Sequence, residues 1–96
     1  MRYHKGGPGL VDRTRTFALR VIRFYSTLPH EVVAQIMGKQ LLRSAMSVGA
    51  QYREAQRAKS IADFVSKCEG SLQELEESAY WFELIEASGT STNASI

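Results

Sequence analysis

The chain has 96 residues, of which 44% are hydrophobic, 23% charged and 9% aromatic, and its net charge is +2. This length fits one small domain, and the apolar content excludes wholesale disorder. The single cysteine excludes a disulfide framework and a cysteine-based zinc cluster, which fits a reducing compartment. No apolar run reaches the ~20 residues that span a bilayer, and the N-terminus lacks the pattern of a secretory signal. We therefore expect a cytoplasmic protein that does not enter a membrane.

The charges are divided unevenly along the chain. Residues 1–27 contain six basic residues and one acidic residue, residues 28–60 contain five and two, and residues 61–96 contain one and seven. This division indicates either a basic surface for a polyanion or basic and acidic helices packed side by side. The second arrangement is common in helical proteins and requires no ligand.

A first helix is predicted over residues 13–28, after a flexible lead over residues 1–11. Asp12 is the expected N-cap. The Leu28-Pro29 step ends this helix, because the residue before a proline disfavours helical geometry and proline suits the start of the next helix. The apolar residues with helical spacing are Phe17, Val21, Phe24, Tyr25 and Leu28, and the arginines lie largely elsewhere.

A second helix is predicted over residues 29–56, with Glu31 in its first turn. Gly38 and Gly49 lie inside it, and each costs about 1 kcal/mol relative to alanine, so we expect them to allow another helix to approach closely. The apolar line of this helix consists of Val33, Met37, Leu41, Ser44, Val48, Tyr52 and Ala55, with Ile36 and Ala45 beside it.

A third helix is predicted over residues 61–88, followed by a flexible tail over residues 90–96. Ser60 and Asp63 match a capping box, and Gly89 is the expected stop. An apolar line with alternating spacings of four and three predicts the buried seam of a bundle: Ile61, Val65, Cys68, Leu72, Leu75, Ala79 and Phe82. A second line widens the buried face: Phe64, Ser71, Ser78 and Ile85. No strand pattern is present, so residues 12–89 are predicted to form an all-α, antiparallel up-down bundle.

The short connections predict which helices are neighbours. A tight turn between Ala58 and Lys59 would pair residues of the second and third helices whose numbers add to about 117. This register predicts a salt bridge between Arg43 and Glu74, worth ~0–1 kcal/mol if exposed. It also places Ser47 level with Gly70, where the glycine would let the backbones approach. The residues assigned to pairing between helices or between subunits are Arg43, Arg53, Glu54, Glu74 and Glu77.

Signatures of enzymes are sparse. His4 and His30 have no partner nearby in the sequence, and the acidic residues of the third helix lack the Glu-x-x-His pairs of a di-iron bundle. The stretch Gly6–Gly9 lacks the Lys-Ser/Thr of a phosphate loop. Cys68 is expected to be an inert thiol in the core. The sequence therefore predicts no enzyme activity, catalytic residue, metal, cofactor or small-molecule substrate.

Two features leave room for a binding function. Arg13, Arg20 and Arg23 of the first helix are candidates for contacts with the phosphates of RNA or DNA. Trp81 and Leu84 lie beside the predicted seam, and in a chain of three helices they would have no partner within the monomer. Exposed apolar surface of that kind marks an interface.

Three strings of residues resemble the four-helix-bundle proteins of the 23S ribosomal RNA intervening-sequence family: Gln40–Ala45, Ser47–Ala55 and Tyr80–Leu84. The resemblance covers about residues 12–88, and Gln51 stands where relatives usually have asparagine. It implies an all-helical bundle, no enzyme activity, and homo-oligomers such as the rings of five seen among relatives. Members carry a fourth helix after the position of Gly89, so this chain resembles either a naturally short member or a truncated one. We expect another subunit to fill the open fourth side.

Two functions follow from these observations. The first is a non-enzymatic helical-bundle oligomerisation module, with a candidate nucleic-acid surface on the first helix. The alternative is a protein-binding adaptor whose apolar groove near Trp81 and Leu84 receives a helix from an unrelated partner.

Overall fold

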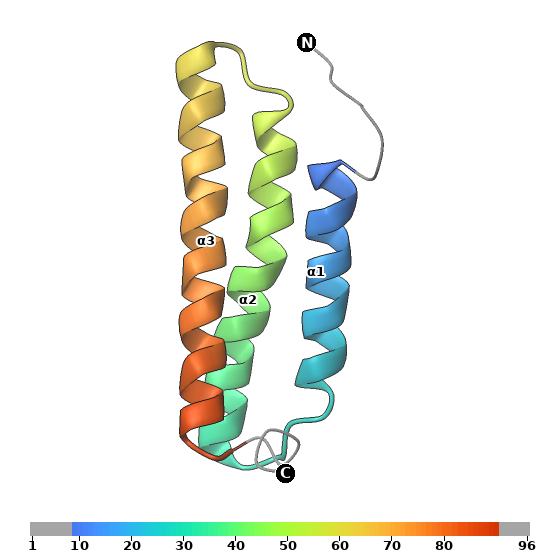
Figure 1. Ribbon diagram of the computed structural model, residues 1–96, viewed down its shortest axis with the longest axis vertical. Helices are drawn as coiled ribbons and strands as arrows, with labels where there is room; N and C mark the ends of the chain where they lie inside the picture. Colours follow the sequence, from blue (N-terminus) through green and yellow to red (C-terminus); the bar gives the residue numbers. More distant parts are fainter. Residues whose placement is uncertain (1–8, 91–96) are drawn as a thin grey trace.

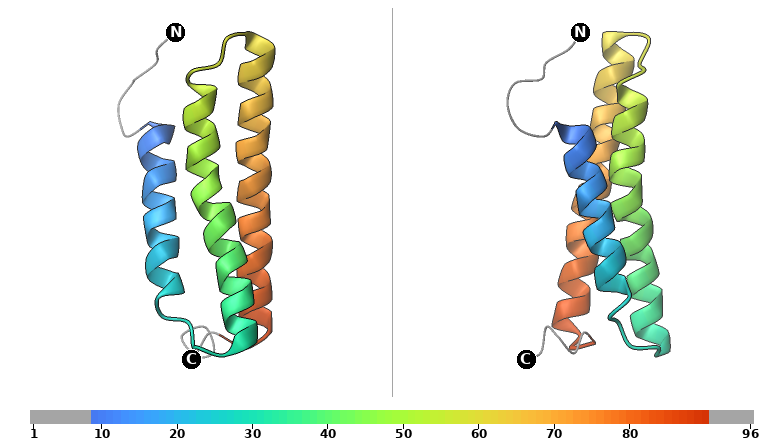
Figure 2. Two further views of the ribbon diagram at one scale, coloured as in Figure 1. Left: turned by 180° about the vertical axis from the view of Figure 1, so that it is seen from behind. Right: turned by 90° about the vertical axis from the view of Figure 1, so that its right-hand side faces the viewer.

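A computed structural model describes residues 9–90 of the chain. They form three helices, α1 (Leu10–Tyr25), α2 (Val32–Ala55) and α3 (Ile61–Ala87), and this part of the chain contains no strand. Figure 1 shows an up-down arrangement in which α2 packs against both of its neighbours, whereas the backbones of α1 and α3 stay apart. Figure 2 shows the same order from behind and from the side. The prediction of an all-α antiparallel bundle is confirmed.

The ends of α1 and the start of α2 differ from the sequence-based expectation. Gly9 is the N-cap of α1, and Asp12 lies in the first turn, where its carboxylate offsets the helix dipole. Glu31 is the N-cap of α2 rather than a first-turn residue. The chain leaves α1 earlier than predicted, because the amide of Leu28 bonds the carbonyl of Tyr25 in a turn, and the Leu28 side chain then folds back into the core.

The predicted lead is partly helical, since α1 begins at Leu10. The rest of the predicted lead, with His4, and most of the predicted tail lie outside the described residues.

Both ends of α3 are confirmed. The Ser60 hydroxyl accepts a hydrogen bond from the amide of Asp63 at 3.0 Å, as a capping box requires. Gly89 has a φ angle of +72°, the left-handed conformation that commonly ends a helix.

The core lies where α1 and α3 cover the inner side of α2. Most of the predicted apolar line of α2 is buried there, but Val33 and Ile36 are exposed on a flank of α2 that neither neighbour covers. Gly38 faces Tyr25 and Leu28, and Gly49 faces Thr14, so both glycines allow α1 to approach α2 as predicted. The buried core cluster consists of Val21, Leu28, Met37, Leu41, Ala45 and Ile85.

The prediction for the buried seam of α3 is wrong except at Phe82, which packs against the core cluster. The residues of α3 that are buried are Ser71, Ser78 and Ile85, which were assigned to the second line. The hydroxyls of Ser44 and Ser78 lie 2.9 Å apart, and Ser71 Oγ donates to the carbonyl of Val48 at 2.7 Å. These short, hydrogen-bonded side chains let α3 pack closely on α2, which turns the larger apolar residues of α3 away from α2.

The register between α2 and α3 is about one turn from the predicted one. Ser44 faces Ser78 and Gln51 faces Gly70, so paired residue numbers add to about 121 or 122. The connection continues past the end of α2 before α3 begins, so α3 extends beyond the end of α2 (Figure 1). Gly70 therefore makes room for the side chain of Gln51 and not for the backbone near Ser47.

Candidate functional site between the first and third helices

Apart from Phe82, the residues of the predicted seam of α3 form a largely exposed line, which we call the α3 stripe: Ile61, Val65, Cys68, Leu72, Leu75 and Ala79. The exposed fractions are 45% for Val65, 55% for Leu72 and 41% for Leu75. The stripe keeps the spacing of a helix seam although no helix of the described residues covers it. Continuous exposed apolar surface is uncommon on a monomer and marks a binding surface.

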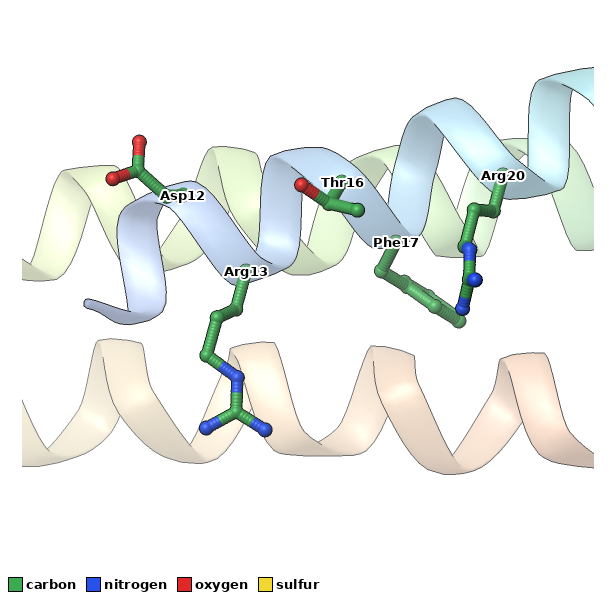
Figure 3. A pocket seen from close by; sticks show the side chains of 5 residues that line it. All are labelled: Asp12, Arg13, Thr16, Phe17 and Arg20. Carbon is green, nitrogen blue, oxygen red and sulfur yellow. The ribbon is translucent and has the colours of Figure 1, made fainter. Parts of the chain in front are cut away.

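The side of α1 that faces this stripe combines basic and aromatic residues. Figure 3 shows Arg13, Phe17 and Arg20 extending from α1 on the side of the α3 ribbon. They line an open hollow together with Asp12 and Thr16. Spacings of four and three residues place such side chains on one face of a helix. Phe17 is half-buried against the core, whereas both arginines are exposed.

Near the C-terminal end of α1, the space between α1 and α3 is closed by an aromatic contact. The rings of Phe24 and Phe82 pack with their centroids 5.4 Å apart. The α3 stripe and the hollow beside Arg13 and Arg20 lie on α3 and on the side of α1 towards α3, and we call these two surfaces together the α1–α3 groove.

The structure brings two of the three candidate nucleic-acid residues together. Arg13 and Arg20 share the hollow, whereas Arg23 is exposed in the last turn of α1 and does not line it. Within residues 9–90, none of the arginines of α1 takes part in a salt bridge. These cations are therefore available to an external anionic group.

The predicted salt bridge between α2 and α3 is confirmed. Arg43 Nη1 lies 3.6 Å from Glu74 Oε1, and Arg43 Nη2 lies 3.0 Å from Glu77 Oε1. Gln51 Nε2 donates to Glu74 Oε2 at 3.4 Å. Glu74 is largely buried, with 16% of its side chain exposed, so this cluster links the two helices and offers no open site.

Arg53 and Glu54 are exposed, and neither forms a salt bridge within the described part of the chain. Their assignment to pairing stays a prediction.

Trp81 and Leu84 have partners within the monomer, contrary to the reason for assigning them to an interface. Both are half-buried and pack against the core cluster. The more exposed aromatic residue is Tyr80, whose ring packs edge-on against Trp81 at a centroid distance of 5.3 Å. A role for Trp81 and Leu84 in binding stays a prediction.

The groups that usually carry catalysis or bind metals do not gather in the described part of the chain. Between residues 9 and 90, no group of three or more His, Cys, Asp or Glu is placed to hold a metal ion. His30 is exposed in the connection between α1 and α2. Cys68 lies half-buried on the α3 stripe and not in the core as predicted. No helix formed by residues 9–90 has the length and apolar character to cross a bilayer.

Three up-down helices that share α2 as their centre, with an apolar groove along the remaining side, define an open helical bundle of the four-helix type. Residues 10–96 match the sequence model of the 23S rRNA-intervening sequence protein family, so the chain belongs to this family. The fold is similar to the crystal structure of a protein of unknown function from the S23 ribosomal protein family of Bacteroides thetaiotaomicron. That similarity has a TM-score of 0.77 and 40% sequence identity, and covers 83% of this chain and 74% of the other. No curated protein matches the chain.

Proposed function

We propose that the protein is a non-enzymatic helical-bundle module that forms oligomers through the α1–α3 groove. The observation that carries this proposal is the α3 stripe, whose leucines and valine are exposed among the described residues 9–90. Burying a Leu or Val side chain completely contributes about 1.5–3 kcal/mol, so covering several half-exposed ones supplies a substantial driving force for association.

The shape of the groove favours a helix over a small molecule. Small-molecule sites are usually enclosed cavities with a few convergent polar groups. The apolar residues of the α3 stripe repeat every three or four residues, which is the pattern that a packed helix recognises.

Light scattering at several protein concentrations tests the proposal. We expect a species heavier than the 10.7 kDa monomer. Leu72→Glu combined with Leu75→Glu places charges on the α3 stripe and should shift the population to the monomer. The matched control is Val32→Glu with Met46→Glu, which adds the same charges at exposed apolar residues of α2 away from the groove.

Circular dichroism should show the same helix content in both double variants. A wild-type chain that remains at 10.7 kDa at every concentration contradicts the proposal and favours the adaptor alternative, in which the groove receives a helix of another protein.

A second candidate function, binding of RNA or DNA, is supported by the arginines of α1. This helix contains four arginines and one aspartate, and none of these residues is in a salt bridge within residues 9–90. If they contact phosphates, affinity for a generic RNA duplex should fall steeply as salt is raised. Arg20→Glu with Arg23→Glu should abolish binding, and an absence of binding by the wild-type chain at low salt would contradict this function.

A further inference from the structure

We propose that a nucleic-acid duplex lies across the surface that α1 and α2 form together on the side away from α3, which we call the α1–α2 face. Cations of both helices contact the phosphates of the duplex, independently of its base sequence. This inference rests on the second candidate function, and it adds the surface, the contribution of α2 and the double-stranded form of the nucleic acid.

The contacts of α2 with its two neighbours define where this face lies. Gly38 of α2 faces Tyr25 of α1, and the hydroxyl of Ser44 faces α3. At ~100° per residue, Ser44 lies about 120° from Gly38 in one direction around α2. Lys39 and Arg53 lie about 100° and 60° from Gly38 in the other direction. Both cations are therefore on the side of α2 that faces away from α3 and borders α1.

The contacts of α1 place two of its arginines beside them. Val21 is buried in the core, and Phe24 packs on Phe82 of α3. Phe24 lies about 60° from Val21 in one direction around α1, whereas Arg15 lies about 120° from Val21 in the other direction. Arg15 therefore belongs to the α1–α2 face. Arg23 lies about 160° from Val21, at the outer edge of this face.

The charge of the α1–α2 face is of one sign. Four exposed cations belong to it: Arg15, Arg23, Lys39 and Arg53. None of them takes part in a salt bridge among the residues that the structure describes. The two acidic residues of α1 and α2 lie elsewhere, since Asp12 lines the hollow towards α3 and Glu54 lies about 160° around α2 from Gly38. Such a surface attracts anionic partners and has no acidic group that would repel them.

The spacing of the four cations favours a polyanion over a single anionic group. The contacts of the two α2 glycines with α1 make the numbers of level residues in the two helices add to 63. Arg15 and Arg53 are therefore near one end of the face, and Arg23 and Lys39 lie about 16 Å further along at ~1.5 Å per residue. A small anion reaches one of these pairs, whereas the backbone of a nucleic acid reaches both.

The aromatic residues of the two helices favour a duplex over a single strand. All four are partly buried: Phe17, Phe24, Tyr25 and Tyr52. Proteins that bind single strands stack the bases on accessible aromatic side chains, and these two helices offer none in an exposed position. A cationic surface without such side chains suits the regular phosphate backbone of a duplex, which it contacts without regard to sequence.

An anionic membrane is a second kind of polyanion, and the composition of the face favours it less. The apolar side chains among the cations are aliphatic and only partly exposed, with 39% of Ile22 and 46% of Met46 accessible. Helices that bind at a membrane surface insert a broad apolar face, with Trp, Phe and Leu side chains, below the headgroups. Vesicles therefore form a separate arm of the test.

Fluorescence anisotropy with short labelled RNA and DNA duplexes tests the proposal. We expect both duplexes to bind, unrelated sequences to differ by no more than about threefold, and single strands to bind about tenfold more weakly. Four phosphate contacts predict that the logarithm of the affinity for duplex DNA falls with the logarithm of the salt concentration at a slope of about −3.6. Vesicles of phosphatidylcholine with one quarter phosphatidylglycerol should bind more weakly than either duplex.

Charge removal tests the contribution of α2. Lys39→Gln with Arg53→Gln should lower the affinity for the duplexes by about tenfold or more and make the salt slope shallower by about 2. The matched control is Arg13→Gln with Arg20→Gln, which removes two cations from the hollow towards α3 and should change the slope by less than about 0.5. Lys39→Arg with Arg53→Lys keeps both charges and should bind like the wild-type chain.

The outcomes separate this inference from the second candidate function. Duplex binding that is lost in the Arg13 and Arg20 variant, but kept in the Lys39 and Arg53 variant, overturns the α1–α2 face and leaves binding of nucleic acid intact. Tighter binding of single strands overturns the duplex. A wild-type chain that binds no nucleic acid at low salt overturns both proposals, and binding of the anionic vesicles alone would assign the face to a lipid surface instead.

Discussion

The two faces of α3 differ in burial, and the buried face carries the smaller and more polar side chains. Towards α2, the helix buries serines, whereas towards α1 it exposes leucines and a valine. Ser71 is 7% exposed and its neighbour Leu72 is 55% exposed. The difference shows that burial of a helix face depends on how closely a neighbour can approach, and not only on the hydrophobicity of that face.

Most polar groups of the α2–α3 contact are paired within the described residues, although the buried Glu74 Oε1 accepts no hydrogen bond. The buried hydroxyls of this contact have hydrogen-bond partners, and the Arg43–Glu74–Glu77 cluster links the two helices at the margin. The α1–α3 groove is incomplete, since its apolar wall and its cations lack partners in the described residues. The first contact therefore holds the fold together, and the second is where association can add free energy. Four predictions test this contrast by measuring the free energy of unfolding at concentrations where the chain is monomeric.

The largest difference is expected between Leu41 and Leu72. Leu41 is fully buried, so Leu41→Ala should destabilise the fold by about 3 kcal/mol through lost transfer energy and the cavity it leaves. Leu72→Ala should change stability by no more than ~0.5 kcal/mol, because its side chain is exposed in the monomer. Urea titrations followed by circular dichroism measure both values. Equal costs would show that the stripe is buried.

Two glycines should respond differently to the same change. A Cβ at position 38 would lie 2.7 Å from Leu28 Cδ1 and 2.9 Å from Tyr25, both packed side chains, so Gly38→Ala should cost about 1–2 kcal/mol despite better helix propensity. A Cβ at position 70 would meet only the amide end of Gln51, which can rotate away. Gly70→Ala should therefore be within ~0.5 kcal/mol of neutral. Thermal melts compare the two, and a severe loss at position 70 would contradict this account of the contact.

The buried serine pair should show coupling. Ser44 Oγ also contacts the carbonyl of Leu41, and Ser78 Oγ that of Glu74, so each hydroxyl keeps an acceptor when the other is removed. Ser44→Ala and Ser78→Ala should each cost about 0.5–1 kcal/mol, and the double variant should cost less than their sum. Additive losses in this double-mutant cycle would mean that the two hydroxyls do not interact.

The smallest effect is expected at the margin of the α2–α3 contact. Arg43 is half-exposed, with 52% of its side chain accessible, so Arg43→Met should cost no more than ~1 kcal/mol. The cost should shrink in molar salt, which screens exposed charges. Unfolding at low and high salt measures the difference, and a cost that does not respond to salt would indicate a packing role for the arginine.

Local signals in the sequence were sufficient for the helices. The capping box at Ser60 and the stop at Gly89 are short-range features whose physical effect does not depend on distant residues. The Arg43–Glu74 pair was also predictable, because a long side chain tolerates a register error of one turn. The ends of α1 were less predictable, since the turn that folds Leu28 into the core depends on contacts with α2.

The sequence did not predict that the α3 stripe would be exposed. The stripe has the spacing of a seam, and spacing is the same whether a neighbour covers the line or leaves it open. The useful signal was the line of small residues at Ser71 and Ser78, seven apart and opposite Ser44, which indicates close packing. Trp81 and Leu84 were predicted to be exposed but are half-buried, because an apolar residue beside a seam can still reach the core.

The sequence by itself determined three amphipathic helices, their antiparallel order and the separation of basic from acidic segments, because these depend on local propensity, periodicity and short connections. Only the tertiary structure decided which face of α3 meets α2 and which stays exposed. That choice depends on the distance at which two whole helices pack, and this distance is set jointly by the side chains of both.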